Sequence, residues 1–269
     1  MNYKLREINI YPVKSLAGIS LQSAEATDRG LKYDRRWMVV DKQGRFLTQR
    51  TYPQMALVRT SIDENKLTLS HRFNYFNPIT VPINHGNEEQ LSVIVWNDTV
   101  YAEAVDKKAD EWLSNALNLD CRLVYMPEDT KRPVDKKYWS KDGVVSFADA
   151  YPFLIIGEES LNDLNSRLAE KIPMNRFRPN FVFSGGEPFD EDRWKKFRIG
   201  SMIFYAVKPC SRCVVTTVNQ ETAEKKDEPL RTLASYRTVG NNVNFGQNLV
   251  HEKPGIIHLG DLLEVLEWK

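Results

Sequence analysis

The feature that most constrains the fold is a series of short runs rich in β-branched and aromatic residues, each closed by turn residues. Such runs favour strands, because their side chains fit the pleated, half-buried surface of a sheet. Residues 41–44 and 96–98 between runs are typical of hairpin turns. The runs predict strands at Leu5–Ile10, Arg36–Val40, Arg45–Thr48, Lys66–Ser70, Leu91–Val95, Thr99–Glu103, Arg122–Met126, Phe153–Ile156, Asn180–Phe183, Phe197–Tyr205, Val214–Val218 and Leu262–Glu267.

Three segments repeat apolar residues at helical spacing instead. They predict helices over Asp106–Asn118, Glu158–Lys171 and Pro229–Tyr236, the last opened by a proline at a first-turn position where its missing N–H is tolerated. Residues 127–145 are polar and charged, with two prolines, and predict a linker or a loop over a site. We therefore expect an α+β, mainly β protein with two β-rich halves.

Composition excludes several classes of protein. The 269 residues carry 37 basic and 36 acidic side chains, a balance that argues against nucleic-acid binding as the main role. No apolar run approaches the roughly 20 residues that span a bilayer, and the first residues lack the apolar stretch of a signal peptide. Three cysteines do not make a disulfide framework, so the sequence predicts a protein of the reducing cytoplasm, with no membrane partner.

Two of the three cysteines, Cys210 and Cys213, form a Cys-x-x-Cys pair with Arg212 between them. A redox dithiol of this type places its reactive thiolate at a helix N-terminus. Here the five β-branched residues Val214–Val218 follow directly and favour a strand, which argues against the dithiol. A structural zinc site needs four ligands, and the remote Cys121 and four isolated histidines do not supply them at paired spacing.

Three thiolates are also too few for an iron–sulfur cluster held by four cysteines within this chain. A third interpretation is a single soft thiolate ligand to a heavy metal that an organic cofactor already holds, with Lys208 and Arg212 as helpful cations. The alternative without chemistry is two buried cysteines that act as small hydrophobic residues. Spacing alone leaves these two interpretations open.

Six separated motifs resemble the MOSC superfamily, in particular the bacterial hydroxylaminopurine-resistance proteins and the mitochondrial amidoxime-reducing components. They are YPVKS at residues 11–15, YDRRW at 33–37, FRPN at 177–180, CSRC at 210–213, EPLRTLASYR at 228–237 and FGQN at 245–248. The resemblance covers about residues 3–267. It implies a MOSC N-terminal β-barrel-like domain over residues 1–125 and a MOSC β-barrel domain with a few helices over 126–269.

The resemblance further implies a molybdenum cofactor, with Cys213 as the one protein ligand of the metal and Cys210 as a supporting residue. The positions that match cofactor-contacting residues of the family are Lys14, Ser15, Arg35, Arg178, Asn180, Ser211 and Arg212. Cations and hydroxyl donors suit the phosphate of such a cofactor. Pro179 predicts an extended Arg178, which would point Arg178 and Asn180 to one face. Asp149 lies near a family position close to the metal and is expected to orient water or substrate.

The implied activity is reduction of small N-hydroxylated compounds such as hydroxylamines, amidoximes and N-hydroxylated bases, with the oxygen released as water. Electrons would come from a separate protein, a flavoprotein reductase or a ferredoxin-like carrier. Pyridoxal phosphate binding is a further expectation at the level of the family. Two alternatives stay open: a sulfur-carrier or cofactor-handling protein with a persulfide on Cys213, and a non-enzymatic small-molecule binding protein.

Overall fold

A computed structural model describes residues 2–63, 65–83, 89–139 and 141–269. The largest sheet closes on itself into a barrel, because β17 pairs with β15 on one side and with β12 on the other. In spatial order the barrel strands are β12 (Phe153–Gly157), β13 (Phe181–Ser184), β1 (Tyr3–Ile10), β19 (Leu262–Trp268), β14 (Trp194–Ile199), β15 (Met202–Ser211) and β17 (Asn242–His251). The mainly β fold predicted from the sequence is confirmed.

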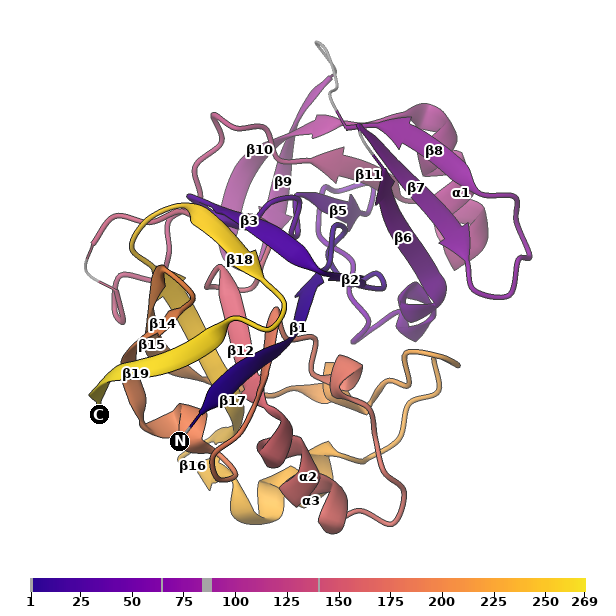
Figure 1. Cartoon of the computed structure of the whole chain (residues 1–269). Coiled ribbons are helices and arrows are strands. Elements are labelled where there is room, and N and C mark those ends of the chain that lie inside the picture. Colours follow the sequence, from indigo (N-terminus) through magenta and orange to yellow (C-terminus); the bar gives the residue numbers. More distant parts are fainter. Residues whose placement is uncertain (1, 64, 84–88, 140) are drawn as a thin grey trace.

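The barrel is built from both ends of the chain. Figure 1 shows the indigo strand β1 among orange and yellow strands, with the two termini close together. β1 pairs antiparallel with β13 and with β19. Two short strands pair with the barrel strands outside the closed ring. β2 (Ile19–Leu21) pairs with the end of β1, and β16 (Thr238–Val239) pairs with the start of β17. The division of the chain after residue 125 stays a prediction.

Aromatic side chains fill the interior of the barrel. Phe153 stacks on Phe181 with ring centroids 5.5 Å apart, and Phe204 meets both rings edge-on. Trp194 and Phe197 continue this cluster at 5.0 Å, and all five side chains are buried. Small barrels are either filled by side chains or hold one small ligand, and here the aromatic rings fill the interior. A functional site must therefore lie outside the barrel wall.

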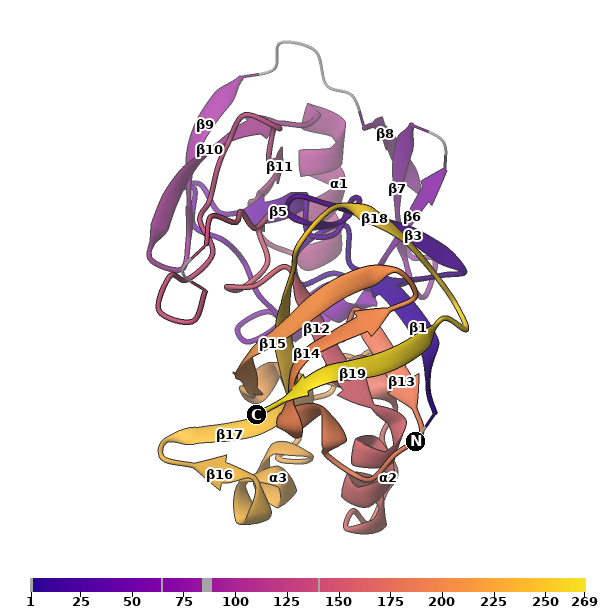
Figure 2. The ribbon, with the colours of Figure 1, turned by 60° about the vertical axis from the view of Figure 1, so that its left-hand side comes forward.

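Three further sheets lie on one side of the barrel, above it in Figure 2. The four-stranded sheet contains β5 (Trp37–Val40), β11 (Arg122–Tyr125), β10 (Asp98–Ala104) and β9 (Gln90–Val95). The two three-stranded sheets contain β18 (Gly255–His258), β3 (Ser23–Thr27) and β4 (Gly30–Leu31), and β6 (Val58–Asp63), β7 (Lys66–His71) and β8 (Ile79–Pro82). The described α-helices are α1 (Lys107–Leu117), α2 (Glu158–Ser166) and α3 (Leu230–Tyr236), none of which is long and apolar enough to cross a membrane.

Helix α1 begins and ends where its sequence signals it. The Asp106 carboxylate accepts hydrogen bonds from the N–H groups of Lys108 and Ala109, which caps the first turn. Asn118 ends the helix in the left-handed conformation, at φ +50°. Its buried face packs on the core beside β8 and β11. Helix α2 ends at Ser166, five residues earlier than the apolar spacing predicted.

Two of the predicted strands were wrong in extent. The run Phe197–Tyr205 contains a hairpin, because Gly200 adopts φ +55° and separates β14 from β15. The run Arg45–Thr48 forms isolated bridges to Val40 and Ile94, not a strand. In both places the side-chain pattern correctly predicted extended backbone, but it did not predict where the strand is interrupted.

A buried carboxyl group beside α2 makes stability depend on pH. Glu191 is fully buried, and burial raises its pKa to about 7, although Gly157 N and Ser160 Oγ donate hydrogen bonds to it. Between about pH 4.3, the usual value of an unfolded glutamate, and pH 7, the folded state binds more protons than the unfolded state. The free energy of unfolding should therefore fall as pH rises through this window.

We expect Glu191→Gln to remove most of this fall, because the amide keeps hydrogen-bonding capacity and carries no charge. Relative to the unmodified protein, Glu191→Gln should have a free energy of unfolding that is higher by on the order of 1–3 kcal/mol at pH 8 and nearly equal at pH 4. Urea unfolding of both proteins at the two pH values measures it. An equal effect at both pH values would contradict the assignment of the pH dependence to Glu191.

Candidate functional site

All nine predicted site residues line one cavity of about 190 Å³ outside the barrel wall. They are Lys14, Ser15, Arg35, Asp149, Arg178, Asn180, Ser211, Arg212 and Cys213. A larger hollow of about 790 Å³ lies beside α2 and α3, but no cysteine lines it. The chemistry of the wall, not the volume, marks the smaller cavity as the candidate site.

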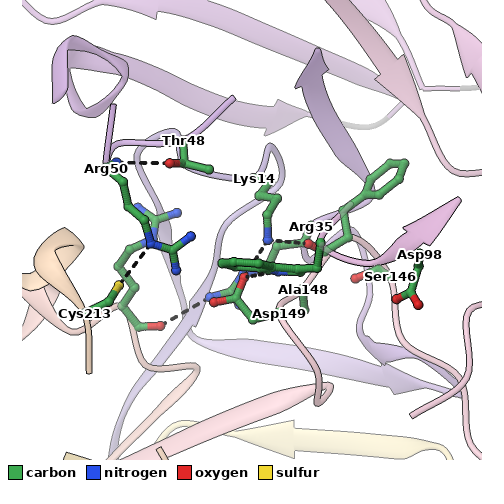
Figure 3. Close-up of polar contacts among 12 residues, drawn as sticks. Lys14, Arg35, Thr48, Arg50, Asp98, Ser146, Ala148, Asp149 and Cys213 are labelled. Carbon is green, nitrogen blue, oxygen red and sulfur yellow. Dashed lines mark hydrogen bonds and ion pairs between the residues drawn. The ribbon is translucent and has the colours of Figure 1, made fainter. Parts of the chain in front are cut away.

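A buried lysine and a carboxylate meet at one wall of the cavity. Lys14 Nζ donates hydrogen bonds to Asp149 Oδ1 at 2.6 Å and to the carbonyl oxygen of Phe147 at 2.8 Å (Figure 3). Burial lowers the pKa of the Lys14 amine, and the Asp149 charge opposes that shift. The surrounding protein raises the pKa of Asp149, but the charges of Lys14 and Arg50 outweigh it and hold this pKa well below its usual range. Asp149 is therefore ionised at neutral pH.

The loop that carries Asp149 is fixed from behind by Arg132, which the sequence analysis did not single out. Its buried guanidinium donates to the carbonyl oxygens of Ser146, Ala148 and Asp149, and its Nε forms an ion pair with Asp98 at 2.6 Å. These bonds fix the backbone on both sides of Ala148. The predicted loop over a site at 127–145 therefore supplies a support of that site, while residue 140 lies outside the described residues.

Two arginines stack on the ring of Tyr11 at another wall of the cavity. The guanidinium carbons of Arg35 and Arg178 lie 4.3 Å and 4.2 Å from the ring centroid. Such cation–π contacts hold the planar groups without using their N–H donors. Within the described residues, the Arg178 side chain has no ion pair and no hydrogen bond. Burial lowers the pKa of Arg178 to about 10, so it remains a cation with free donors at the cavity.

The predicted extended conformation of Arg178 was wrong. Arg178 adopts φ +55°, and Ser15 and Arg35 also lie in the left-handed region, at +68° and +50°. The bias that Pro179 imposes is weak, and the Tyr11 stack together with the bond from Arg35 Nη2 to the Arg178 carbonyl oxygen overrides it. Strained non-glycine backbone of this kind gathers at functional sites.

Asp34 is the buried anion that organises this wall. Its carboxylate accepts bonds from Tyr11 N at 2.7 Å, from Arg35 Nη1 at 2.5 Å and from Asn180 Nδ2 at 3.1 Å. Asn180 also donates to the carbonyl oxygen of Asn9, and its own oxygen accepts from Leu154 N. Asn180 is 1 % exposed, and in this structure its amide connects Asp34 to the backbone of Asn9 and Leu154. The YDRRW motif contains Asp34 beside Arg35, but the sequence analysis assigned no role to this carboxylate.

The strand predicted at Val214–Val218 was wrong. Residues Val214–Thr217 form the 3₁₀ turn η4, and Cys213 is its N-cap residue. Each β-branched residue disfavours a helical turn by only a few tenths of a kcal/mol. Here the hydroxyls of Thr216 and Thr217 donate to the carbonyl oxygens of Cys213 and Val214, which stabilises the turn. A helical turn does follow Cys213, so the argument against a redox dithiol from a strand at this place no longer holds.

The two cysteines of the pair have different surroundings. Cys210, at the end of β15, packs against the apolar cluster outside the barrel, and burial raises the pKa of its thiol. Its sulfur lies 3.1 Å from Arg212 Nη1, which donates to it, while Arg212 Nη2 donates to the carbonyl oxygen of Phe177. Arg212 Nε is buried without a hydrogen-bond partner among the described residues. The Ser211 hydroxyl bonds to Asn242 at 3.0 Å.

Among the residues that the sequence analysis missed, Arg50 and Trp96 lie nearest to Cys213 and Asp149. Arg50 Nε lies 3.3 Å from Cys213 Sγ, and its guanidinium stacks 4.3 Å from the ring of Trp96 (Figure 3 shows Arg50 reaching to the sulfur). The Trp96 indole N–H donates to Asp149 Oδ1 at 3.2 Å. The only sequence signal was the hairpin turn predicted at 96–98, where a tryptophan is an unusual residue.

A buried pair of glutamines joins the two halves of the site. Gln49 and Gln220 exchange hydrogen bonds at 3.2 Å and 2.8 Å. Gln49 also donates to the carbonyl oxygen of Ser15, and Gln220 donates to that of Val218, just after η4. A fully satisfied buried network of this kind specifies one arrangement. It fixes the Lys14–Ser15 turn relative to the turn that follows Cys213.

Comparison with known proteins places the chain in a family. Residues 2–120 match the model of the MOSC N-terminal beta barrel domain, and residues 142–264 match the model of the MOSC domain. The chain belongs to the MOSC family. The resemblance noted from the six sequence motifs is therefore confirmed.

Curated MOSC relatives fall into two groups. The chain is 35 % identical to mitochondrial amidoxime-reducing component 1 of Mus musculus, over 96 % of this chain and 80 % of that protein. The human protein of the same name is 34 % identical over 96 % and 81 %. The molybdenum cofactor sulfurase of Arabidopsis thaliana is 33 % identical over 93 % of this chain. The chain spans only 33 % of the length of that sulfurase.

Proposed function

We propose that this protein is a molybdenum-cofactor oxidoreductase that reduces small N-hydroxylated compounds. The observation that carries the proposal is the sulfur of Cys213, which accepts a hydrogen bond from Arg50 at a cavity lined by six basic side chains and one carboxylate. The basic residues are Lys14, Arg35, Arg50, Arg176, Arg178 and Arg212, and the carboxylate is Asp149. The similarity to amidoxime-reducing components favours an oxidoreductase, and both groups of relatives support a role connected with the molybdenum cofactor.

The residues of the cavity fit an anionic cofactor that ends in a phosphate. Arg178 offers an unpaired guanidinium, and Arg212 has a buried Nε without a partner among the described residues. Arginine forks match phosphate oxygens in geometry as well as charge. In the proposal these two residues, with Lys14, Ser15, Arg35, Asn180 and Ser211, hold the cofactor. Cys213 supplies one soft sulfur ligand to its metal, as suits molybdenum.

When bound, the cofactor supplies two-electron chemistry at the N–O bond, so that an N-hydroxyl compound, two electrons and two protons give the N–H compound and water. The residues of the chain position the substrate. The ionised Asp149 accepts a hydrogen bond from the substrate N–OH group, while Lys14 and the Trp96 indole hold the carboxylate in place. The bonds of Arg132 to the loop keep this acceptor fixed during turnover.

The electrons come, in this proposal, from a separate flavoprotein reductase or ferredoxin-like carrier. The mouse and human relatives are mitochondrial by name, so a cytoplasmic location of this protein stays a prediction. Binding of pyridoxal phosphate likewise stays a prediction.

The test is to produce the protein in a host that makes molybdopterin and to measure molybdenum, pterin and benzamidoxime reduction with an artificial electron donor. We expect close to one molybdenum and one pterin for each chain, and benzamidine as the product. A protein that stays free of molybdenum in a host that loads a control molybdoenzyme would contradict the proposal.

The similarity to plant molybdenum cofactor sulfurases supports a second candidate, a protein that carries sulfur on Cys213 as a persulfide. The sulfur lies at the cavity and Arg50 donates to it, which suits an anionic persulfide as well as a metal ligand. Incubation with a cysteine desulfurase followed by mass spectrometry distinguishes the two. A gain of one sulfur atom on Cys213, without pterin, favours the second candidate.

A further inference from the structure

Arg50 is the cation that the cofactor-binding set leaves unexplained. It lines the cavity and lies 3.3 Å from Cys213 Sγ. Within the described residues it forms no ion pair, and its Nη1 and Nη2 groups have no hydrogen-bond partner. An arginine stays protonated at any physiological pH, so a permanent charge lies beside the proposed metal ligand.

The structure holds this charge in place from its other side. The ring of Trp96 covers the guanidinium at 4.3 Å and itself packs against Phe46 at 5.0 Å. Trp96 adopts φ +58° in the turn between β9 and β10 and is 38 % exposed. Asparagine or glycine is the usual residue at such a position, and a bulky ring there is a conformational outlier. A tryptophan therefore lies at a conformationally unfavourable position, from which it contacts both Arg50 and Asp149.

The charge next to the reacting position matters because the proposed reaction changes the charge of its substrate. The oxygen of a hydroxylamine or amidoxime withdraws electrons and makes the nitrogen a weak base, so these substrates are neutral at pH 7. The amine or amidine that remains after the oxygen leaves is a strong base and takes up a proton. Amidoximes and aliphatic hydroxylamines thus enter neutral and leave as cations, whereas N-hydroxylated bases leave uncharged.

We propose that Arg50 selects by charge. Its free N–H groups donate hydrogen bonds to the neutral N–O substrate, and its charge repels the cationic product from the position beside Cys213. The inference rests on the proposed function and assigns to Arg50 a role separate from holding the cofactor. Coulomb repulsion between two unit charges a few ångströms apart, partly screened by solvent, suffices for about a tenfold change in affinity. Weak product inhibition follows.

The experiment measures binding of benzamidine, a cation, and benzamide, its neutral counterpart, to the molybdenum-loaded protein by calorimetry and as inhibitors of benzamidoxime reduction. We expect Arg50→Gln to bind benzamidine about 10-fold more tightly while benzamide changes by less than about 2-fold. Arg50→Lys keeps the charge and should keep the discrimination. Arg59→Gln, which removes an exposed arginine on β6, is the matched control and should behave as the unmodified protein.

Salt provides a readout that a merely structural role of Arg50 would not change. Raising the ionic strength from about 0.1 M to about 1 M shortens the screening length from about 10 Å to about 3 Å. The difference in benzamidine affinity between the unmodified protein and Arg50→Gln should therefore become smaller. Unchanged benzamidine affinity in an active, loaded Arg50→Gln protein, or equal tightening of benzamide, overturns the charge selection alone. If the unmodified protein is loaded with molybdenum but cannot reduce benzamidoxime, the proposed function itself is overturned.

Discussion

Replacing Cys213 by alanine should remove molybdenum from the purified protein and lower benzamidoxime reduction by more than about 100-fold. Partners that only support a metal ligand already matter by about 10–100-fold, so loss of the ligand itself should exceed that range. Pterin should be retained in part, because the proposed phosphate contacts of Arg178 and Arg212 are untouched. Metal analysis, pterin fluorescence and steady-state rates of the same preparation measure the three effects.

Cys210→Ser is the matched control, because it alters the other sulfur of the same Cys-x-x-Cys pair. We expect it to keep its molybdenum and most of its activity, since Cys210 packs against the apolar cluster and its sulfur contacts Arg212. If both substitutions abolish activity while both proteins keep their metal, the pair acts as a redox dithiol. That result would reject the single-ligand interpretation.

Replacing Asp34 by alanine should lower the free energy of unfolding by about 3–5 kcal/mol, the usual result of removing one partner of a buried ion pair. Asp34 is 2 % exposed, and its loss removes the carboxylate paired with Arg35 and leaves the backbone N–H of Tyr11 without its acceptor. The wall that presents Arg35 and Arg178 should loosen, so cofactor content should fall as well. Urea unfolding of the cofactor-free protein measures the stability directly.

Asp63→Ala is the control for this substitution, because Asp63 is an exposed carboxylate at the end of β6. Its effect should stay within about 0.5 kcal/mol. Asp34→Asn should fall between the two, since the amide oxygen can still accept one bond. A loss for Asp34→Ala no larger than that of the control would show that Asp34 does not organise the wall.

Much of the fold follows from local patterns. The alternation in β10 and the apolar run of β12 predicted strands close to their observed bounds, because burial of one or both faces of a strand is written into the side-chain order. Helix α1 was equally clear, with its capping aspartate and its helical apolar spacing. The nine site residues named from the sequence all line the cavity, eight of them from the separated motifs and Asp149 from outside them.

The failures share one physical cause. At Val214–Thr217 the local preference amounts to a fraction of a kcal/mol, and at Arg178 the left-handed backbone costs roughly 1–3 kcal/mol. In both places hydrogen bonds or a ring stack from distant residues outweigh the local preference. Arg176, for example, donates to the carbonyl oxygen of Thr216 from another element. Such contacts leave no periodic signal in the sequence.

The sequence by itself therefore determined the mainly β class, the helix α1 and the set of residues that could serve a cofactor. Only the tertiary structure decided how they meet. It brought Arg50 to the sulfur of Cys213 across 163 positions of the chain, and it joined Gln49 to Gln220 across 171. Burial and periodicity are local properties of a chain, whereas the pairing of a charge with a sulfur depends on which loops the closed barrel places side by side.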